Sequence, residues 1–196
     1  MININLIYYK DKSENGNFGD EISKFITKKL INNNKYKLVY NENNITNNII
    51  CIGSYIHMAK NDTYIFGSGV RTIDNIEKGH KYKNLKVSAV RGPLTREFLK
   101  KKNIYVPEIY GDPALLLSRF YKPIFVAELE NKICIIPHKS NFKYYVNNID
   151  TNKYFLVSPT EKWELVVNYI YSCKAIISSS LHGLICSDAY NKPNLW

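Results

Sequence analysis

The chain has 196 residues, a formal net charge of +10, 45% hydrophobic residues and 22% charged residues. This composition excludes a chain that is disordered throughout, and the length is enough to bury a core in one or two domains. No apolar run reaches the roughly 18–20 residues that a membrane-spanning helix needs, and the first residues lack the basic lead and the cleavage site of a signal peptide.

Short β-rich runs alternate with helical patterns, which is typical of an α/β fold with parallel strands. In the first part of the chain we predict strands at 4–9, 37–40, 48–53, 64–69 and 86–90. The helix after the first strand is indicated by apolar residues at helical spacing, with Asp20 as a candidate N-cap: Ile22, Phe25, Ile26 and Leu30.

A second helix is predicted directly after the strand at 86–90. Pro93 suits its first turn, and its predicted buried stripe consists of Leu94, Phe98 and Leu99. The segment 104–117 is interpreted as a strand, a turn at Gly111 and a short helix capped by Asp112.

The second part of the chain repeats the alternation after a connector at 118–131. Strands are predicted at 132–138, 154–157 and 174–180, and helices from Ser158 to Cys173 and at 181–191. Ser158 and Glu161 have the spacing of a capping box at the start of the first of these helices. The residues from Lys192 to Trp196 indicate entry into one more strand, so we expect a truncated or naturally short second lobe.

The positive charge does not identify a partner by itself. Lysine pairs and triplets stand at the ends of predicted helices, where cations complement the helix dipole. We do not expect a nucleic-acid partner, because the sequence has no helix-turn-helix pattern, no RNP-like aromatic segment and no basic stripe. A solvated surface, an anionic membrane face and an anionic substrate all stay open as explanations.

The cysteines are far apart in the sequence and lie in apolar surroundings: Cys51, Cys134, Cys173 and Cys186. This pattern predicts buried free thiols, and no spacing of Cys and His indicates a zinc site. A reducing, cytoplasmic location is the expectation that follows.

Four loops that follow predicted strands carry the residues that could do chemistry: 17–21, 67–69, 91–93 and 178–183. In parallel α/β sheets the ligand site lies at the carboxyl ends of the strands, where such loops gather. The candidates are glycines, hydroxyls, one Arg, one His, two carboxylates and their neighbours, namely Asn17, Gly19, Asp20, Glu21, Gly67, Ser68, Gly69, Arg91, Ser179, Ser180, Leu181 and His182. His138 is added because it also follows a predicted strand.

His182 stands where a strand ends in three serines and a helix begins. The first turn of that helix favours an anion, and His182 is able to move a proton beside it near neutral pH. The alternative is that Ser179 or Ser180 only caps the helix while His182 packs into the sheet. The residues leave both interpretations open.

The other candidates also have two interpretations. Arg91 suits either a clamp on a phosphate or carboxylate or a salt bridge that holds the strand end. Asp20 and Glu21 either meet substrate hydroxyls, or Asp20 caps its helix. Gly67 to Gly69 match a common turn as well as a ligand loop.

The order of several segments resembles the polysaccharide pyruvyl transferase family, most closely its exopolysaccharide and capsule branch. These segments are GNFGDEI, FGSGV, AVRGPLTREFL, GDPALLL, IIPHKSNF and the final IISSSLHGLICSDAYNKPNLW, and they cover essentially the whole chain. The resemblance implies two Rossmann-like lobes of glycosyltransferase-B type, at 1–122 and, in partial form, at 123–196. It also implies transfer of pyruvate from phosphoenolpyruvate to a sugar as a cyclic ketal, in bacterial surface polysaccharide synthesis, without a metal or cofactor.

By the same resemblance, His182 matches the family's acid/base histidine, while Ser180 stands where the wider family pattern has an Arg. The anion contact is therefore expected from Arg91, the helix N-terminus and His138 instead. The expected catalytic set is His182, Asp20 and Glu21, the donor-binding set is Arg91, Ser179, Ser180, Leu181 and His138, and the acceptor-binding set is Asn17, Gly19, Gly67, Ser68 and Gly69.

The implied partners are phosphoenolpyruvate and a glycan acceptor that is carried on a lipid, with peripheral contact at the inner face of the cell membrane. The oligomeric state is not predicted. Two other functions stay open: a glycosyltransferase of the same two-lobed type that uses a nucleotide-sugar, and a catalytically silent glycan-binding or scaffold protein.

Overall fold

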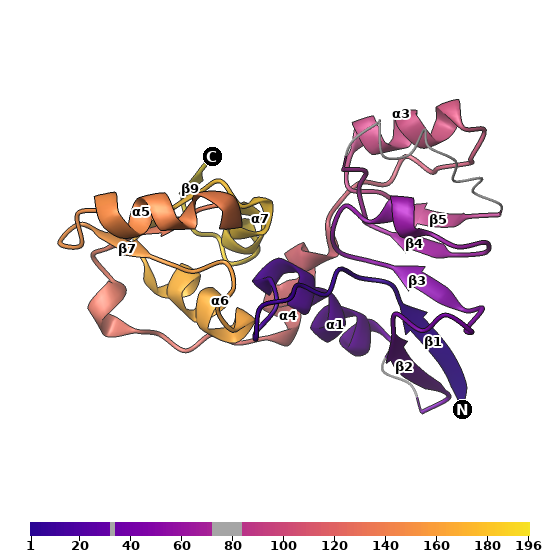
Figure 1. Ribbon diagram of the computed structural model, residues 1–196, viewed down its shortest axis with the longest axis horizontal. Coiled ribbons are helices and arrows are strands. Elements are labelled where there is room, and N and C mark those ends of the chain that lie inside the picture. The colour runs from indigo at the N-terminus through magenta and orange to yellow at the C-terminus, as the bar shows by residue number, and fades with distance from the viewer. Residues whose placement is uncertain (32–33, 72–83) are drawn as a thin grey trace. The chain divides into compact units, whose positions relative to one another are not determined.

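The computed structural model describes residues 1–31, 34–71 and 84–196. The chain forms two compact units. The first contains Met1–Tyr9 and Ser23–Pro113, and the second contains Lys10–Ile22 and Ala114–Trp196. Each unit holds a parallel sheet (Figure 1). The expected α/β class with parallel sheets is therefore confirmed.

The first unit is built on a sheet of five strands with the order β2-β1-β3-β4-β5. The strands are β1 (Ile2–Leu6), β2 (Tyr36–Tyr40), β3 (Asn48–Ile50), β4 (Tyr64–Phe66) and β5 (Lys86–Ala89). Helices α1 (Phe18–Leu30), η1 (Ile56–Met58) and α3 (Pro93–Lys101) accompany them, and η2 (Pro113–Leu116) begins at the end of the unit. A buried apolar cluster fills its core: Ile7, Ile50, Ile56, Ile65, Val90, Leu99 and Val106.

The second unit is built on a sheet of four strands with the order β7-β6-β8-β9. The strands are β6 (Ile133–Ile136), β7 (Tyr154–Leu156), β8 (Ala175–Ser178) and β9 (Asn194–Leu195). The helices are α4 (Leu117–Phe120), η3 (Ala127–Leu129), η4 (Lys139–Asn141), α5 (Phe142–Asn148), α6 (Trp163–Ser172) and α7 (Leu181–Ala189). Figure 1 shows α5 and α6 on opposite sides of this sheet, and α6 packs against α7.

Helix α1 begins at Phe18, three residues earlier than an N-cap at Asp20 requires. Asn17 caps it instead, because its Oδ1 accepts the Gly19 N–H at 3.1 Å. Asp20 lies inside the first turn and is buried, and Asp and Glu are favoured in this turn by the helix dipole. The prediction that Asp20 is the N-cap is therefore wrong.

Helix α3 begins at Pro93 as predicted, but Leu94 does not belong to its buried face. Leu94 is 80% exposed, whereas Thr95 and Leu99 are buried. Residues four positions apart share a helix face, and Leu94 lies one position away from that pair. The prediction placed Leu94 in the buried stripe because Leu is apolar, whereas the structure buries its polar neighbour Thr95.

Two further predictions are wrong, one on the strand in the segment 104–117 and one on the start of helix α6. Residues 104–110 form no strand among the described residues, apart from an isolated bridge between Val90 and Tyr110. Helix α6 begins at Trp163 rather than Ser158, because the Ser158 hydroxyl accepts the Thr160 N–H at 3.3 Å and forms a local turn. Helix α5 was not predicted.

The cysteines divide into two kinds. Cys51 and Cys186 are buried free thiols as predicted, and burial raises the pKa of the Cys51 thiol to about 12. Cys134 and Cys173 form a disulfide with their Cα atoms 5.9 Å apart, so the prediction that they are free is wrong. The end of α6 lies against β6, which brings these two residues together. A reducing compartment does not follow from these cysteines.

No helix in the described ranges combines the length and the apolar character needed to cross a membrane.

Candidate functional site

The strands of both sheets are added in the same order along the chain. Each unit begins with a strand that becomes central, places the next strand on one side and continues on the other side. In open α/β sheets, ligands bind at the carboxyl ends of the strands where the order reverses. These switch points lie between β1 and β3 in the first unit, and between β6 and β8 in the second.

The switch point of the second unit carries predicted site residues on both sides. His138 follows β6, and Ser179 follows β8. The His138 N–H donates to the Ser179 Oγ at 2.9 Å, so the two loops are tied together. The ring Nδ1 of His138 lies 2.8 Å from the Ser140 hydroxyl and accepts the Ser140 N–H at 3.3 Å. Both residues are exposed.

The first turn of α7 is held by Ser178 rather than by Ser179 or Ser180, which the alternative interpretation gave as caps. The Ser178 hydroxyl donates to the Ile136 carbonyl at 2.8 Å and accepts the Ser180 N–H at 3.0 Å. Ser180 is the N-cap residue by position, but within the described chain it makes no side-chain capping bond. A Cβ on Gly183 would overlap the Ser178 hydroxyl, so this turn requires glycine. The α7 N-terminus is therefore not blocked by the side chain of Ser180, and such a terminus favours anions.

His182, one residue into α7, packs against the start of α1. Gly19 leaves just enough space for this, because a Cβ at Gly19 would overlap the His182 ring. The Phe18 N–H donates to the Pro159 carbonyl at 3.0 Å, which fixes the same turn of α1 to the loop after β7. The ring of His182 therefore contacts a segment from the beginning of the chain, and the choice between a packed histidine and a proton-moving one stays open.

The two carboxylates of α1 lie differently. Asp20 is 5% exposed, and Glu21 is partly exposed. The Glu21 carboxylate folds back over Gly16, where the φ of +71° favours glycine and an added Cβ would meet the Glu21 oxygen. The turn before α1 therefore requires a glycine at position 16.

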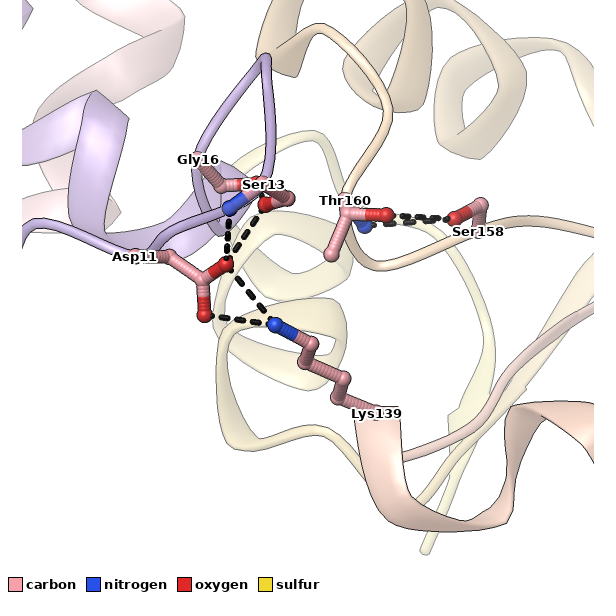
Figure 2. A network of polar contacts seen from close by, with 6 residues as sticks. All are labelled: Asp11, Ser13, Gly16, Lys139, Ser158 and Thr160. Carbon is pink, nitrogen blue, oxygen red and sulfur yellow. Dashed lines mark hydrogen bonds and ion pairs between the residues drawn. The ribbon is translucent and has the colours of Figure 1, made fainter.

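An ion pair joins this N-terminal segment to the loop after β6 (Figure 2). Lys139 Nζ lies 2.8 Å from both carboxylate oxygens of Asp11, and the Ser13 hydroxyl donates to Asp11 at 2.6 Å. The Asp11 side chain is only 8% exposed. The hydrogen bond from Lys139, followed by those from Ser13, lowers the pKa of Asp11 to about 2. Sequence reasoning missed this pair, because no local pattern links residues that are 128 positions apart.

A partly buried cation, Arg91, lies at the carboxyl end of β5 in the first unit. Arg91 Nε donates to the Asp112 carboxylate at 2.9 Å, and its Nη1 donates to the Ser54 hydroxyl at 2.8 Å. Asp112 is buried, and the Arg91 guanidinium lies against the Gly69 backbone. The salt-bridge interpretation of Arg91 is therefore confirmed. Its Nη2 is buried and has no hydrogen-bond partner among the described residues. This nitrogen of the guanidinium therefore takes no part in the salt bridge.

The loop after β4 is a rigid support for Arg91. The Ser68 hydroxyl is buried and donates to the Gly53 carbonyl at 2.7 Å, while the Gly69 N–H donates to the same carbonyl at 3.0 Å. Gly67 has a φ of +79° and lies against Pro113. Sequence reasoning missed Ser54, although a Gly-Ser pair follows both β3 and β4 and gave a signal for it.

The predicted site residues thus form one group in each unit. The second unit brings together Asn17, Gly19, Asp20, Glu21, His138, Ser179, Ser180, Leu181 and His182, and the first unit holds Gly67, Ser68, Gly69 and Arg91. Residues 10–22, which the predicted division placed in a lobe at 1–122, pack with the second unit. The contacts of Asp11, Phe18 and Gly19 are the physical reason for this difference.

Comparison with known proteins gives one family. The family model for polysaccharide pyruvyl transferases matches residues 17–196. An uncharacterized protein of Acanthamoeba polyphaga mimivirus is 28% identical to the chain over 195 residues, which covers 92% of this chain and 63% of that protein. The chain therefore spans less than two thirds of the length of this relative. No solved structure matches the chain.

Proposed function

The chain belongs to the polysaccharide pyruvyl transferase family, and we propose that it transfers the enolpyruvyl group of phosphoenolpyruvate to a sugar during synthesis of a surface polysaccharide. The product is a pyruvate ketal across two sugar hydroxyls. The reaction uses phosphoenolpyruvate as a substrate and needs no resident cofactor. We also propose that the two units are the lobes of a glycosyltransferase-B type fold and that the protein works in the cytoplasm on a glycan carried by a lipid.

The contact between His182 and Gly19 is the observation that supports this proposal most directly. The two residues belong to the first and the last of the segments that resemble the family, and they meet at the carboxyl end of the second sheet. His182 lies in the first turn of α7, and its contact Gly19 is followed in the chain by the buried Asp20. An anionic substrate with a group to be protonated suits these neighbours.

In the proposed reaction, His182 gives a proton to the methylene carbon of phosphoenolpyruvate, and an oxocarbenium centre forms at the adjacent carbon. A sugar hydroxyl attacks that centre and loses its proton to a base, for which Asp20 and Glu21 are the candidates. The phosphate then leaves with the electrons of its C–O bond. A second hydroxyl attacks the same carbon, loses its proton and closes the ketal. The net products are the ketal and inorganic phosphate.

The remaining predicted residues are proposed to bind the substrates. The α7 N-terminus with Ser179, Ser180 and Leu181, together with His138, supplies N–H and hydroxyl donors for the phosphate or the carboxylate. Arg91 is proposed to bind an anionic group of the donor through the corner of its guanidinium that Asp112 leaves unused. Asn17, Gly19 and the loop from Gly67 to Gly69 stay predictions as acceptor contacts.

A direct test measures phosphate release by ³¹P NMR from phosphoenolpyruvate in the presence of a panel of hexose acceptors. His182→Gln is expected to lower the rate by about a hundredfold to ten-thousandfold, because it removes a general acid. His57→Gln, in the first unit, serves as the matched histidine control, and circular dichroism verifies that both variants fold. Full activity in His182→Gln would exclude the role given to this residue.

The same experiment separates the two other functions. If the wild-type chain releases no phosphate from phosphoenolpyruvate but consumes a nucleotide-sugar, the protein is a glycosyltransferase. If it does neither and binds glycans, it is a binding protein.

A further inference from the structure

Two tyrosine rings lie in parallel at the switch point of the first unit. Tyr9 comes three residues after β1 ends, and Tyr55 comes five residues after β3 ends. Their ring centroids are 6.1 Å apart, and the ring planes differ by 13°. Tyr9 is 46% exposed, and Tyr55 is partly buried. An aromatic pair with accessible ring surface therefore stands at the position where α/β sheets bind ligands.

The backbone fixes Tyr9 in place. Tyr8, the residue before it, is buried and exchanges two hydrogen bonds with the side chain of Asn41, each 3.1 Å long. These bonds hold the backbone at Tyr8, and the side chain of the next residue, Tyr9, is 46% exposed. The outward position of Tyr9 is therefore set before any ligand arrives.

Tyr55 is fixed by the loops after β3 and β4. Its N–H donates to the Ser68 hydroxyl at 3.4 Å. Its ring covers Gly53, where the φ is +102° and an added Cβ would overlap the ring. A glycine is therefore required at position 53 so that the ring can contact the backbone there. Preorganised rings of this kind bind with a small loss of conformational entropy.

Polar donors adjoin the ring pair. Ser54, the residue before Tyr55, accepts a hydrogen bond from Arg91. Arg91 also has a buried Nη2 without a partner in the described ranges of the chain. The edge of the first sheet thus offers a flat apolar surface and a hydroxyl within one unit, next to the cation that is proposed for the donor. A pyranose ring needs this combination, because one of its faces is made of C–H groups and its rim carries hydroxyls.

We propose that Tyr9 and Tyr55 form the acceptor subsite, in which the C–H face of a hexopyranose stacks on the exposed ring of Tyr9 and the stacked Tyr55 ring supports it. This inference rests on the proposed function, because the sugar is an acceptor only if the protein transfers pyruvate to it. Phosphoenolpyruvate has no ring, so an aromatic platform has no partner on the donor. A nucleotide is the less suitable ligand, because the carboxylate described at this edge, Asp112, is bound to Arg91 rather than placed for a ribose diol.

The test measures sugar binding without turnover. Saturation-transfer NMR with methyl hexopyranosides of gluco, galacto and manno configuration is recorded on the full chain. Tyr9→Ala is expected to weaken binding by about tenfold, the effect of one lost aromatic contact, while Tyr9→Phe keeps it within about twofold. Tyr64→Ala is the matched control, because Tyr64 is 45% exposed in the same unit but lies at the amino end of β4.

Three results would overturn the subsite: no saturation transfer to any of the three sugars in the wild-type chain, equal binding in Tyr9→Ala and wild type, or binding of uridine diphosphate that displaces the sugar and depends on Tyr9. Thermal unfolding verifies that Tyr9→Ala is folded.

The failure of this inference differs from the failure of the proposed function. If sugars bind through Tyr9 but phosphoenolpyruvate releases no phosphate, the subsite holds and the pyruvyl transfer fails. If phosphate is released and Tyr9→Ala leaves the KM of the acceptor unchanged, the transfer holds and the subsite fails. The expected result is a rise of about tenfold in the acceptor KM with an unchanged KM for phosphoenolpyruvate.

Discussion

The two units carry different side chains at the carboxyl ends of their strands, with Arg91 after the edge strand β5 and His182 after β8, beside the switch point. Both sheets start from a strand that becomes central and extend to both sides of it. In the first unit this edge holds Arg91, locked by the buried carboxylate of Asp112. In the second unit it holds His182 beside a helix N-terminus. The two edges therefore differ in the side chains that they present, a guanidinium in an ion pair in the first unit and an imidazole in the second.

The edges also differ in how they are built. The first unit makes its edge from its own successive loops, which exchange short hydrogen bonds through Gly53 and Ser68. The second unit adds residues 10–22 to loops that follow much later in the chain. It holds them with the Asp11–Lys139 ion pair, and its sheet carries the Cys134–Cys173 disulfide. The edge with the acid/base candidate is thus the one that depends on long-range links.

The largest expected effect concerns the disulfide. Reduction is expected to lower the free energy of unfolding of the second unit by about 3–4 kcal/mol, because the bond closes a long loop and restricts the unfolded chain. The first unit, whose Cys51 is a free thiol, is expected to keep its stability. Amide hydrogen exchange with and without reductant measures the protection of each unit separately.

The double variant Cys134→Ala, Cys173→Ala is the control for this measurement, since the reductant has no bond to break in it. Equal loss of protection in both units would contradict the difference between them.

The next effect tests the contact between Gly19 and His182. Gly19→Ala forces the added methyl group into the ring, so the ring or the first turn of α1 has to move. A shift of about 1 Å at a catalytic group costs about a hundredfold in kcat. Turnover of phosphoenolpyruvate measures this loss.

Gly92→Ala is the matched glycine control in the first unit. A Cβ at Gly92 meets nothing within 4 Å, and the φ of −165° suits any residue. A Gly19→Ala variant that is as active as Gly92→Ala would show that the position of the His182 ring does not matter.

The sequence predicted each group of site residues but not how the second group is assembled. Alternating strands and helices indicated that Arg91 follows β5 and that His182 begins α7, because these positions depend on local patterns. The packing of Gly19 on His182 depends on contacts between segments at opposite ends of the chain, for which a local pattern carries no signal. The disulfide between Cys134 and Cys173 escaped prediction for the same reason.

The missed and misplaced helices have a different cause. Helix α5 carries Tyr144 and Val146 on exposed positions and has no buried residue, so its sequence lacks the apolar period that predicts a helix. In α3 a Thr takes a buried position and a Leu an exposed one. Hydrophobicity alone therefore assigned the wrong face of α3. Thr95 can be buried because its hydroxyl accepts the Val70 N–H, and this hydrogen bond offsets the cost of removing the hydroxyl from water.

The smallest expected effect is the pH dependence of the Asp11–Lys139 link. The pKa of Asp11 is lowered in the folded chain from 3.8 to about 2, so the folded state binds this proton less readily than the unfolded state. The link therefore contributes its full stability above about pH 4 and loses it as the pH falls towards 2. Because Lys139 is 48% exposed, solvent screening limits the contribution to about 1 kcal/mol.

Asp11→Asn is expected to remove this acid dependence from the second unit while the first unit keeps its own. Glu14→Gln is the matched control, since Glu14 is an exposed carboxylate of the same segment. Hydrogen exchange of the amides of residues 11–22 between pH 2 and 5, corrected for intrinsic rates, measures the effect. If Asp11→Asn and wild type lose protection in parallel as the pH falls, then Asp11 does not hold the segment, and the edge of the second unit depends on Phe18 and Gly19 alone.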